Sequence, residues 1–385
     1  MFGETDIDVN KEDLLEGQDR YIDEVDAGLE EEAKDEEGYF SVKTGETFNK
    51  GRYQIVSAVG RGVFSTVLCA KDLQTDMDVA IKVIRSNDVM YRAGQKEIAL
   101  LRQIAENDPE DKKHIVRMLD HFMHKGHLCI VFERYDLNLR EVMKKFGKNT
   151  GINIAAVRSY GKQLLIALQH LVKLDIVHAD IKPDNVLVTK ARNVVKMCDL
   201  GSASTTAELA ITPYLVSRFY RAPEIMLGHE YDSQIDLWSV ACCLFEMYTG
   251  RILFAGRNNN QMLKHIQDLC GAFSNKMLRK SMFRELHFRD DFVFISKEKD
   301  PVSKKGILRH INYQEMTANS TKEVSSAAGR KDLLKMICPN LGQLDDEELK
   351  RVTLFRDLME KMLVLDPNKR IGVKGALLHP FFTSK

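Results

Sequence analysis

Two hydrophobic periodicities divide the chain near residue 133. From Tyr39 onward, short runs of β-branched and other apolar residues alternate with turns, a pattern typical of antiparallel strands. These runs cover residues 53–60, 66–72 and 76–85, with two more between residues 114 and 135 around a turn at His124–Gly126. One helical repeat, at residues 93–105, lies among them. This part of the sequence predicts a small, sheet-dominated lobe of five strands and one helix.

Beyond residue 133 the hydrophobic period becomes helical. Long apolar or amphipathic stretches cover residues 157–174, 233–250, 259–273 and 349–365. The second is apolar on nearly every face, so we expect a buried helix there. Residues 286–331 show little periodicity, which indicates a surface insertion. The sequence predicts an α+β, bilobal fold with a small β-rich N-lobe at 39–133, a larger, mainly helical C-lobe at 134–385 and a hinge near 133–136.

Charged side chains are distributed unevenly, although 56 Lys and Arg residues balance 56 Asp and Glu residues in total. Residues 1–38 contain 16 acidic and 3 basic residues, a net charge of −13, so the remainder carries +13. The acidic segment has few large apolar side chains to offset the entropy lost on ordering, which predicts a disordered tail. The alternative is an acidic arm that folds onto the basic remainder or recruits a basic partner.

The sequence indicates neither a membrane span nor secretion. No stretch approaches the ~18 consecutive apolar residues of a membrane helix, and the N-terminus lacks the basic start and apolar centre of a signal peptide. The seven cysteines are scattered through apolar runs without C-x-x-C spacing, so we expect reduced thiols rather than a disulfide or zinc framework. We therefore expect a soluble, intracellular protein with no membrane partner.

A glycine-rich turn is the first candidate for chemistry. In VGRGVFSTV, at residues 59–67, Gly60 and Gly62 lie between two strands, where they allow close backbone approach to phosphates. The turn departs from G-x-G-x-x-G because Ser65 takes the third glycine position. An ordinary hairpin is the alternative interpretation.

A lysine and a glutamate form the second candidate. Lys82 ends the strand VAIK, and Glu97 lies on the helix that follows. A lysine at a strand end is often only an edge charge. An ion pair with Glu97 would instead hold its ammonium group against two phosphate groups.

The segment HADIKPDN, at residues 178–185, places three polar side chains at offsets that suit a tight loop. There Asp180 could accept a proton from an attacking hydroxyl, Lys182 could neutralise a transferring phosphate, and Asn185 could offer an amide oxygen to a hard cation. Asp199, fourteen residues after Asn185, would add a carboxylate ligand. Magnesium prefers such oxygen ligands and keeps phosphate oxygens in its shell. The set is typical of phosphoryl transfer, which depends on positioning and charge stabilisation.

In this order and spacing, the motifs resemble those of the eukaryotic protein kinases, over about residues 53–382. DLG at 199–201 stands in place of D-F-G, and APE follows at 222–224. The resemblance implies the protein kinase fold, ATP and Mg²⁺ as cofactors, and catalytic groups that meet between the two lobes. Ala179 replaces the arginine of H-R-D, which removes a clamp for a phosphorylated activation loop. Lys182 is similar to the lysine of serine/threonine kinases.

The segment ITPYLVSRFYRAPE, at residues 211–224, resembles the CMGC group of protein kinases, as does a long insertion at about 255–335. This resemblance implies that Tyr214, once phosphorylated, would pair with Arg218 and Arg221. The alternative is a packed tyrosine beside structural arginines.

The same resemblance implies two structural contacts around the active site. Ser217 would hydrogen-bond the catalytic Asp180 and Lys182. Glu224 and Arg370 would form an ion pair that ties the activation segment to a C-terminal helix.

An adenine pocket also follows from the resemblance. The apolar residues expected to sandwich the base are Val59, Val67, Ala80 and Leu187. Phe132 is similar to a bulky gatekeeper, and the Glu133 carbonyl and the Tyr135 N–H would read the edge of the adenine. For each apolar member, an ordinary core position is the alternative.

Longer stretches, among them NLREVMKKFGK, CDLGSAS and NKMLRKSMF, resemble the pre-mRNA processing kinases of the spliceosome, near the dual-specificity tyrosine-regulated and Cdc2-like kinases. This resemblance implies a nuclear serine/threonine kinase that acts on splicing factors, autophosphorylates a tyrosine of its activation loop and works as a monomeric catalytic domain. That family commonly has a basic, Ser/Arg-rich N-terminal extension, whereas residues 1–38 are acidic.

Two other functions are open to this sequence. A pseudokinase-like scaffold would bind splicing proteins without turnover. The sequence retains polar residues assigned to catalysis and metal binding, which argues against a scaffold: Lys82, Glu97, Asp180, Asn185 and Asp199. Direct RNA binding would suit the +13 charge outside the tail, but the chain has no RNP-type aromatic motif. We therefore expect protein substrates and no direct nucleic-acid partner.

Overall fold

The computed structural model describes residues 38–148, 150–299, 305–319 and 331–384. It comprises two compact units. Among the described residues, the first contains 38–105 and 117–134, and the second contains 106–116 and those from 135 onward. The acidic tail expected at residues 1–38 lies outside the described residues, except for Gly38. None of the helices within the described ranges is long and apolar enough to span a bilayer.

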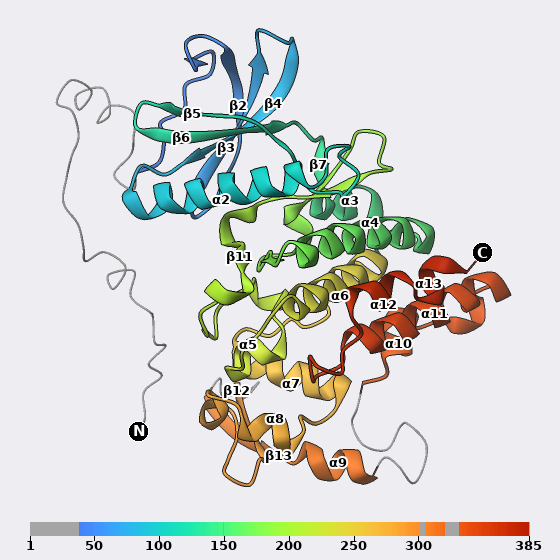
Figure 1. The fold of residues 1–385 in the computed structure, drawn as a ribbon. Coiled ribbons are helices and arrows are strands. Elements are labelled where there is room, and N and C mark those ends of the chain that lie inside the picture. The colour runs from blue at the N-terminus through green and yellow to red at the C-terminus, as the bar shows by residue number, and fades with distance from the viewer. Residues whose placement is uncertain (1–37, 149, 300–304, 320–330, 385) are drawn as a thin grey trace. The chain divides into compact units, whose positions relative to one another are not determined.

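A six-stranded antiparallel sheet forms the first unit, with the strand order β1-β2-β3-β4-β6-β5. The strands are β1 Thr47–Phe48, β2 Tyr53–Arg61, β3 Ser65–Asp72, β4 Met77–Ile84, β5 Met118–His124 and β6 His127–Glu133. Helix α2 (Asp88–Glu106) lies along one face of the sheet (Figure 1). The five expected strands and the helix are all present. β1 is additional, and its two residues are too few to show an alternating pattern.

The hydrophobic core of this sheet supports only one end of β2. Tyr53 and Ile55 are buried, whereas every residue from Val56 to Arg61 is exposed. The core is built by apolar side chains of the sheet and of the segment before β1: Phe40, Phe48, Leu68, Ile81, Val83 and Val131. The glycine turn therefore follows the exposed end of β2.

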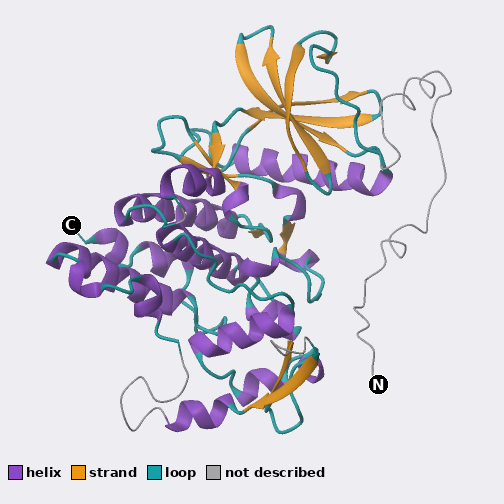
Figure 2. Ribbon diagram, turned by 180° about the vertical axis from the view of Figure 1, so that it is seen from behind, coloured by secondary structure: helices purple, strands orange, loops and turns teal. Residues whose placement is uncertain are grey.

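The second unit is mainly helical (Figure 2). Its helices are α3 Leu139–Gly147, α4 Ile154–Lys173, α5 Pro223–Leu227, α6 Gln234–Thr249, α7 Asn259–Cys270, α8 Asn275–Arg279, α9 Tyr313–Asn319, α10 Leu333–Ile337, α11 Asp346–Met362, α12 Val373–Leu377 and α13 Pro380–Thr383. A small sheet joins β10 Val195–Met197, β9 Val186–Val188 and β7 Leu137–Asn138, and β8 Ile176–Val177 pairs with β11 Ser204–Thr205. These short strands border the catalytic loop and the activation segment.

Helix α6 is the centre of the second unit. Every residue from Ile235 to Met247 is buried, as its continuous apolar pattern predicted. Helix α4 approaches it so closely that a Cβ atom added to Gly161 would lie 2.7 Å from Leu244 Cδ2. A glycine at this position therefore allows the two helices to pack in direct contact. The buried helix α6 supports the catalytic loop, which contacts it.

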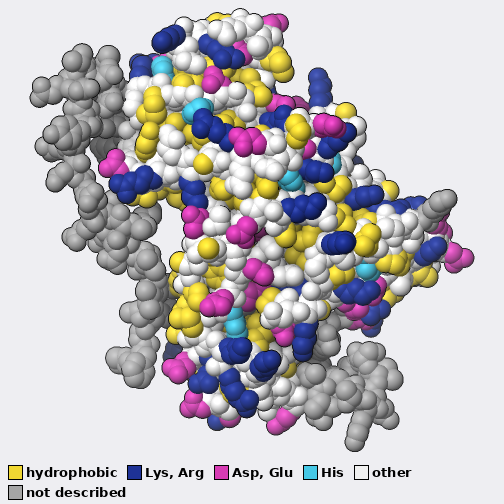
Figure 3. All heavy atoms as spheres, in the orientation of Figure 1, with side chains coloured by type: hydrophobic (Ala, Val, Ile, Leu, Met, Phe, Trp, Pro, Cys, Tyr) yellow, Lys and Arg dark blue, Asp and Glu magenta, His cyan; other side chains and the backbone are white. Residues whose placement is uncertain are grey.

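The surface insertion has more regular structure than its sequence pattern indicated. An antiparallel hairpin pairs β12 (Phe294–Lys299) with β13 (Gly306–Ile311). Its alternation is hidden because the buried positions of β12 are Phe294 and the polar Ser296. Lys and Arg side chains gather on the face around α8 and β13 (Figure 3). The exposed basic residues there are Lys276, Arg279, Lys280, Arg289, Lys297, Lys305 and Arg309.

Candidate active site

The first unit brings Lys82 and Glu97 together as an ion pair. Lys82 Nζ, near the end of β4, lies 2.8 Å from both carboxylate oxygens of Glu97 on α2. Glu97 is 3% exposed and the Lys82 side chain is 10% exposed. The symmetric contact fixes the ammonium group in one place, which is the arrangement required to hold phosphates.

Neither packing within the protein nor backbone conformation requires glycine at positions 60 and 62 of the turn. A Cβ atom added to Gly60 would meet nothing within 4 Å, and one added to Gly62 would meet only Ser65 O, at 3.8 Å. Neither residue adopts a positive φ angle. Because neither packing nor backbone conformation excludes a side chain, close approach of an external group is the remaining physical reason for a glycine.

Three residues assigned to the adenine pocket, Val67, Ala80 and Phe132, share one face of the sheet in the first unit. Cross-strand pairing aligns Val67 with Lys82 and Ala80 with Phe132. Val67, Ala80 and Phe132 are half-buried, whereas their neighbours on the opposite face are fully buried. Val59 is 66% exposed. These positions leave apolar surface available to a flat ligand such as a purine.

The remaining members of that pocket are also half-buried. They are Glu133 at the end of β6, Tyr135, and Leu187 on β9. Leu187 pairs with Lys196 of β10 and with Asn138 of β7, which fixes its position next to the catalytic loop. Their assignment to the adenine pocket remains a prediction.

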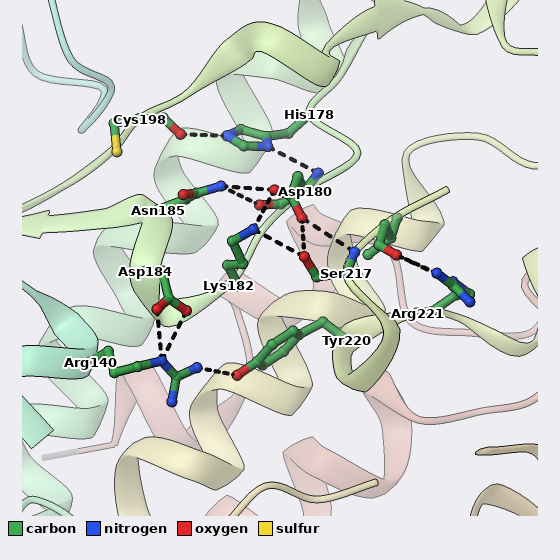
Figure 4. Close-up of polar contacts among 11 residues, drawn as sticks. Arg140, His178, Asp180, Lys182, Asp184, Asn185, Cys198, Ser217, Tyr220 and Arg221 are labelled. Carbon is green, nitrogen blue, oxygen red and sulfur yellow. Dashed lines mark hydrogen bonds and ion pairs between the residues drawn. The ribbon is translucent and has the colours of Figure 1, made fainter. Parts of the chain in front are cut away.

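The catalytic loop converges on the carboxylate of Asp180 (Figure 4). Its Oδ1 accepts a hydrogen bond from Ser217 Oγ at 2.6 Å and another from the Ser217 backbone N–H at 3.2 Å. Its Oδ2 accepts from Lys182 Nζ at 2.7 Å and from Asn185 Nδ2 at 3.1 Å. Lys182 also donates to Ser217 Oγ at 3.0 Å, so the expected triad of Asp180, Lys182 and Ser217 is assembled.

A buried aspartate, which was not predicted from the sequence to have a role, holds the backbone of this loop. Asp236, on α6, accepts hydrogen bonds from the backbone N–H groups of His178 at 2.7 Å and Ala179 at 3.0 Å. Ala179 has a φ of 61°, an unfavourable backbone conformation that these bonds help to maintain. Burial raises the pKa of Asp236, and the two amide bonds oppose that shift. An acidic residue near the start of a largely apolar helix, which contains one other acidic residue, was the available sequence signal.

His178 connects the catalytic loop to the segment that carries Asp199. One ring nitrogen lies 3.0 Å from Cys198 O, and the other accepts from the Asp180 N–H at 3.3 Å. Asp199 itself adopts a left-handed conformation, with a φ of 64°. The histidine therefore sets the distance between the catalytic loop and the second acidic residue.

Asn185 and Asp199 are the oxygen donors in the second unit that could hold Mg²⁺. Asn185 is 8% exposed, and its Nδ2 donates to Asp180 O at 2.9 Å. The amide nitrogen is thus engaged, which leaves the amide oxygen for a cation. In the described part of the chain, no cluster of three His, Cys, Asp or Glu residues could hold a metal by itself. This donor set fits Mg²⁺, which is often bound by one or two protein oxygens and completes its shell with phosphate and water.

The activation segment places Tyr214 in contact with Arg221. Arg221 Nη2 donates to Tyr214 O at 2.9 Å, and its guanidinium carbon lies 5.8 Å from the centre of the tyrosine ring. Arg221 also donates to Val216 O and to Asn259 Oδ1. Arg218 is exposed and makes no ion pair among the described residues. Burial, with a smaller effect of the nearby Arg218 charge, lowers the pKa of Arg221 to about 10.

The expected ion pair of Glu224 and Arg370 is present and fully buried. Arg370 Nη1 and Nη2 lie 2.7 and 2.9 Å from the two carboxylate oxygens, and neither side chain is exposed. Arg370 also donates to Val364 O and Gln234 O, and it lies 5.0 Å from the Trp238 ring. It therefore joins α5, at the end of the activation segment, to α6 and to the segment that precedes α12.

A second ionic network beside the catalytic loop was not foreseen from the sequence (Figure 4). Arg140, on α3, contacts Asp184 at 2.8 Å and Glu246 at 2.7 Å, and donates to the Tyr220 hydroxyl at 2.7 Å. Tyr220 donates in turn to Glu246 at 2.6 Å. The network links the catalytic loop, the activation segment and α6.

All seven cysteines are free thiols, and burial raises the pKa of Cys129, Cys242 and Cys243. The protonated form is therefore favoured at these three positions, so they pack as small apolar residues.

Comparison with known proteins gives a consistent result. The protein kinase domain family matches residues 53–382. Serine/threonine-protein kinase prp4 of Schizosaccharomyces pombe is 46% identical over 359 residues, which cover 93% of this chain and 72% of that protein. Serine/threonine-protein kinase prpf4B of Dictyostelium discoideum is 45% identical over 350 residues, which cover 90% of this chain and 41% of that protein. The chain therefore belongs to the protein kinase family, among its serine/threonine kinases.

Proposed function

We propose that the chain transfers the γ-phosphoryl group of ATP, bound with Mg²⁺, to serine and threonine hydroxyls of other proteins. The observation that carries this proposal is the Asp180 carboxylate, which four donors hold at 2.6–3.2 Å. A carboxylate fixed in this way can accept the proton of a substrate hydroxyl at the moment of attack. Lys182, 2.7 Å from Asp180, supplies a positive charge beside the reacting oxygen.

Lys82 and the glycine turn would bind the phosphates of ATP, while Val67, Ala80, Phe132 and Leu187 contribute to the pocket for its base. Asn185 and Asp199 would hold Mg²⁺, which neutralises phosphate charge when it is bound. Phosphoryl transfer requires the groups of both units to act on one nucleotide, because positioning and electrostatic stabilisation supply most of the rate enhancement.

The decisive comparison is between the wild type and Asp180→Asn, with a basic Ser/Thr protein as substrate and radiolabelled ATP. Asparagine preserves the size of the side chain but cannot accept the proton in the same way. We expect a loss of activity on the order of 10²–10⁴-fold, the usual contribution of general acid–base catalysis. Equal, measurable activity of the two proteins would exclude Asp180 as the proton acceptor, whereas a wild type with no activity above background would support the alternative of a pseudokinase-like scaffold.

We further propose that the substrates are pre-mRNA splicing factors and that the protein acts in the nucleus. The support is the motif resemblance to the spliceosomal kinases together with the similarity to prp4 and prpf4B over about nine tenths of the chain. Phosphosite mapping on nuclear extract, with Asp180→Asn as the matched control, tests the substrate class. Sites that depend on the active enzyme but lie outside splicing proteins would contradict it.

Autophosphorylation of Tyr214 is a second proposal, supported by the electrostatics of Arg221. Among the described residues, no carboxylate pairs with this buried guanidinium, and its polar contacts are carbonyl oxygens and the Asn259 amide. The Tyr214 side chain is 52% exposed, so its hydroxyl is open to modification. A phosphate would bring a charge of roughly −1.5 to −2 toward an uncompensated cation.

Intact-mass analysis tests this proposal on active enzyme and on Tyr214→Phe. We expect one phosphate fewer in the variant, together with lower activity. An active wild type that carries no phosphate on Tyr214 would refute it.

A further inference from the structure

We propose that Tyr39, which lies outside every kinase motif of this chain, positions the glycine turn for ATP. This inference rests on the proposed function, because it assigns a role in nucleotide binding. The Tyr39 hydroxyl lies 2.9 Å from Gly62 O and 3.0 Å from Val63 O. The one O–H proton of Tyr39 is therefore shared between two consecutive carbonyl oxygens at the tip of the turn, in a three-centre hydrogen bond.

The geometry of the peptide bond gives this contact a functional consequence. In a trans peptide the C=O of one residue and the N–H of the next point in opposite directions. By fixing the carbonyls of Gly62 and Val63, Tyr39 aims the N–H groups of Val63 and Phe64 away from itself. Among the described residues neither N–H has a hydrogen-bond partner. Two consecutive free N–H groups form a site suited to an anion such as a phosphate.

The turn has little other support of its own. The Gly62 N–H donates to Ser65 O at 2.8 Å and closes the turn, and Arg85 donates from its backbone N–H to Phe64 O at 3.1 Å and from its Nη1 to Val63 O at 3.2 Å. Val63 and Phe64 are exposed by 60% and 44%. An exposed turn with few internal contacts samples several conformations unless an outside group restrains it, so the hydroxyl of Tyr39 reduces the entropy that nucleotide binding must overcome.

The tyrosine ring is itself held firmly, so it can act as a fixed support. Tyr39 is 7% exposed, and the guanidinium groups of Arg61 and Arg85 lie 3.6 and 4.5 Å from the ring centre. On its N-terminal side, Gly38 O accepts from the Ser86 N–H at 2.9 Å. These contacts involve the ring and the backbone rather than the hydroxyl.

The residue that follows anchors the segment in the core of the sheet. Phe40 is 6% exposed and packs edge-on against Phe48, with 5.1 Å between ring centres, and against His127, at 5.3 Å. Removing the hydroxyl of Tyr39 alone would therefore release the turn without releasing the segment.

Tyr39→Phe is the test, because it removes one oxygen and keeps the ring. We expect the Kd for a fluorescent ATP analogue with Mg²⁺, and the KM for ATP, to rise roughly three- to tenfold, the usual effect of losing one or two neutral hydrogen bonds. The KM for the protein substrate and the melting temperature should not change. Tyr91→Phe is the matched control, because Tyr91 loses only an exposed hydrogen bond from Gln95 on α2.

Two results would overturn the inference. In one, Tyr39→Phe binds the analogue as tightly as wild type. In the other, ATP affinity, protein-substrate KM and melting temperature all worsen together, which indicates a general structural role. The Asp180→Asn comparison separates these outcomes from failure of the proposed function, because analogue binding does not require turnover. If wild type is active, Asp180→Asn is inactive and Tyr39→Phe is normal, only the role of Tyr39 is refuted.

Discussion

The ion pair of Glu224 and Arg370 allows the stability of the second unit to be tested quantitatively. Both side chains have 0% exposure, and both guanidinium nitrogens face the carboxylate at 2.7 and 2.9 Å. Replacing Arg370 by Met leaves the Glu224 charge buried without a partner. Breaking a buried pair in this way costs about 3–5 kcal/mol.

This cost translates into a large shift in melting temperature. For a unit of this size, each kcal/mol lowers the midpoint by about 2–4 °C, so Arg370→Met should melt at least about 6 °C below wild type. Trp238 is the single tryptophan of the chain, is fully buried in α6 and lies 5.0 Å from Arg370. Its fluorescence therefore reports unfolding of the second unit without interference from the first.

The double variant Glu224→Leu/Arg370→Met separates charge from packing. It removes the uncompensated carboxylate, but Val364 O and Gln234 O still lose the donor that Arg370 provided. Each lost bond costs about 1 kcal/mol, so the double variant should melt between wild type and Arg370→Met. A single variant that melts within about 2 °C of wild type, or a double variant less stable than the single one, would refute this reasoning.

Three further predictions concern turnover and pH dependence. Lys82→Ala should lower kcat by on the order of 100-fold or more, since the phosphate-binding charge is lost, and near-normal kcat would argue against the proposed role of Lys82 in holding phosphate. Asp236→Asn should lower kcat about tenfold or more while ATP affinity, measured with the fluorescent analogue, stays constant, because the amide cannot accept both backbone N–H groups. Burial lowers the pKa of His287 to about 4. The unfolded chain, with an ordinary histidine pKa of about 6.5, binds the proton first, so stability falls as the pH drops from about 6.5 toward 4, by up to about 3 kcal/mol. Urea unfolding at pH 7 and 4.5 should show a smaller loss for His287→Gln than for wild type, and equal losses would contradict the assignment.

Local sequence patterns were sufficient for the elements that carry a long, regular repeat. The strands around Lys82 and the buried helix α6 were predicted because alternation and helical spacing extend over many residues. The two-residue strand β1 is too short for any period, and the β12–β13 hairpin places a polar Ser296 at a buried position, so its alternation does not appear as hydrophobicity. The sequence therefore predicted the elements whose buried positions hold apolar residues. It missed the elements that are very short or that bury a polar side chain.

The same distinction applies to the active site. Asp180, Lys182 and Asn185 lie within six residues, so a tight loop alone explains how they meet, and their spacing could be recognised. Asp236 meets the backbone of Ala179 from 57 residues away, and Tyr39 meets Gly62 O from 23 residues away. In both contacts the partner is a backbone group, which every residue has and no sequence pattern marks. Residues that support a site through the backbone of another segment are therefore found by geometry, and Tyr39 is such a residue at the glycine turn.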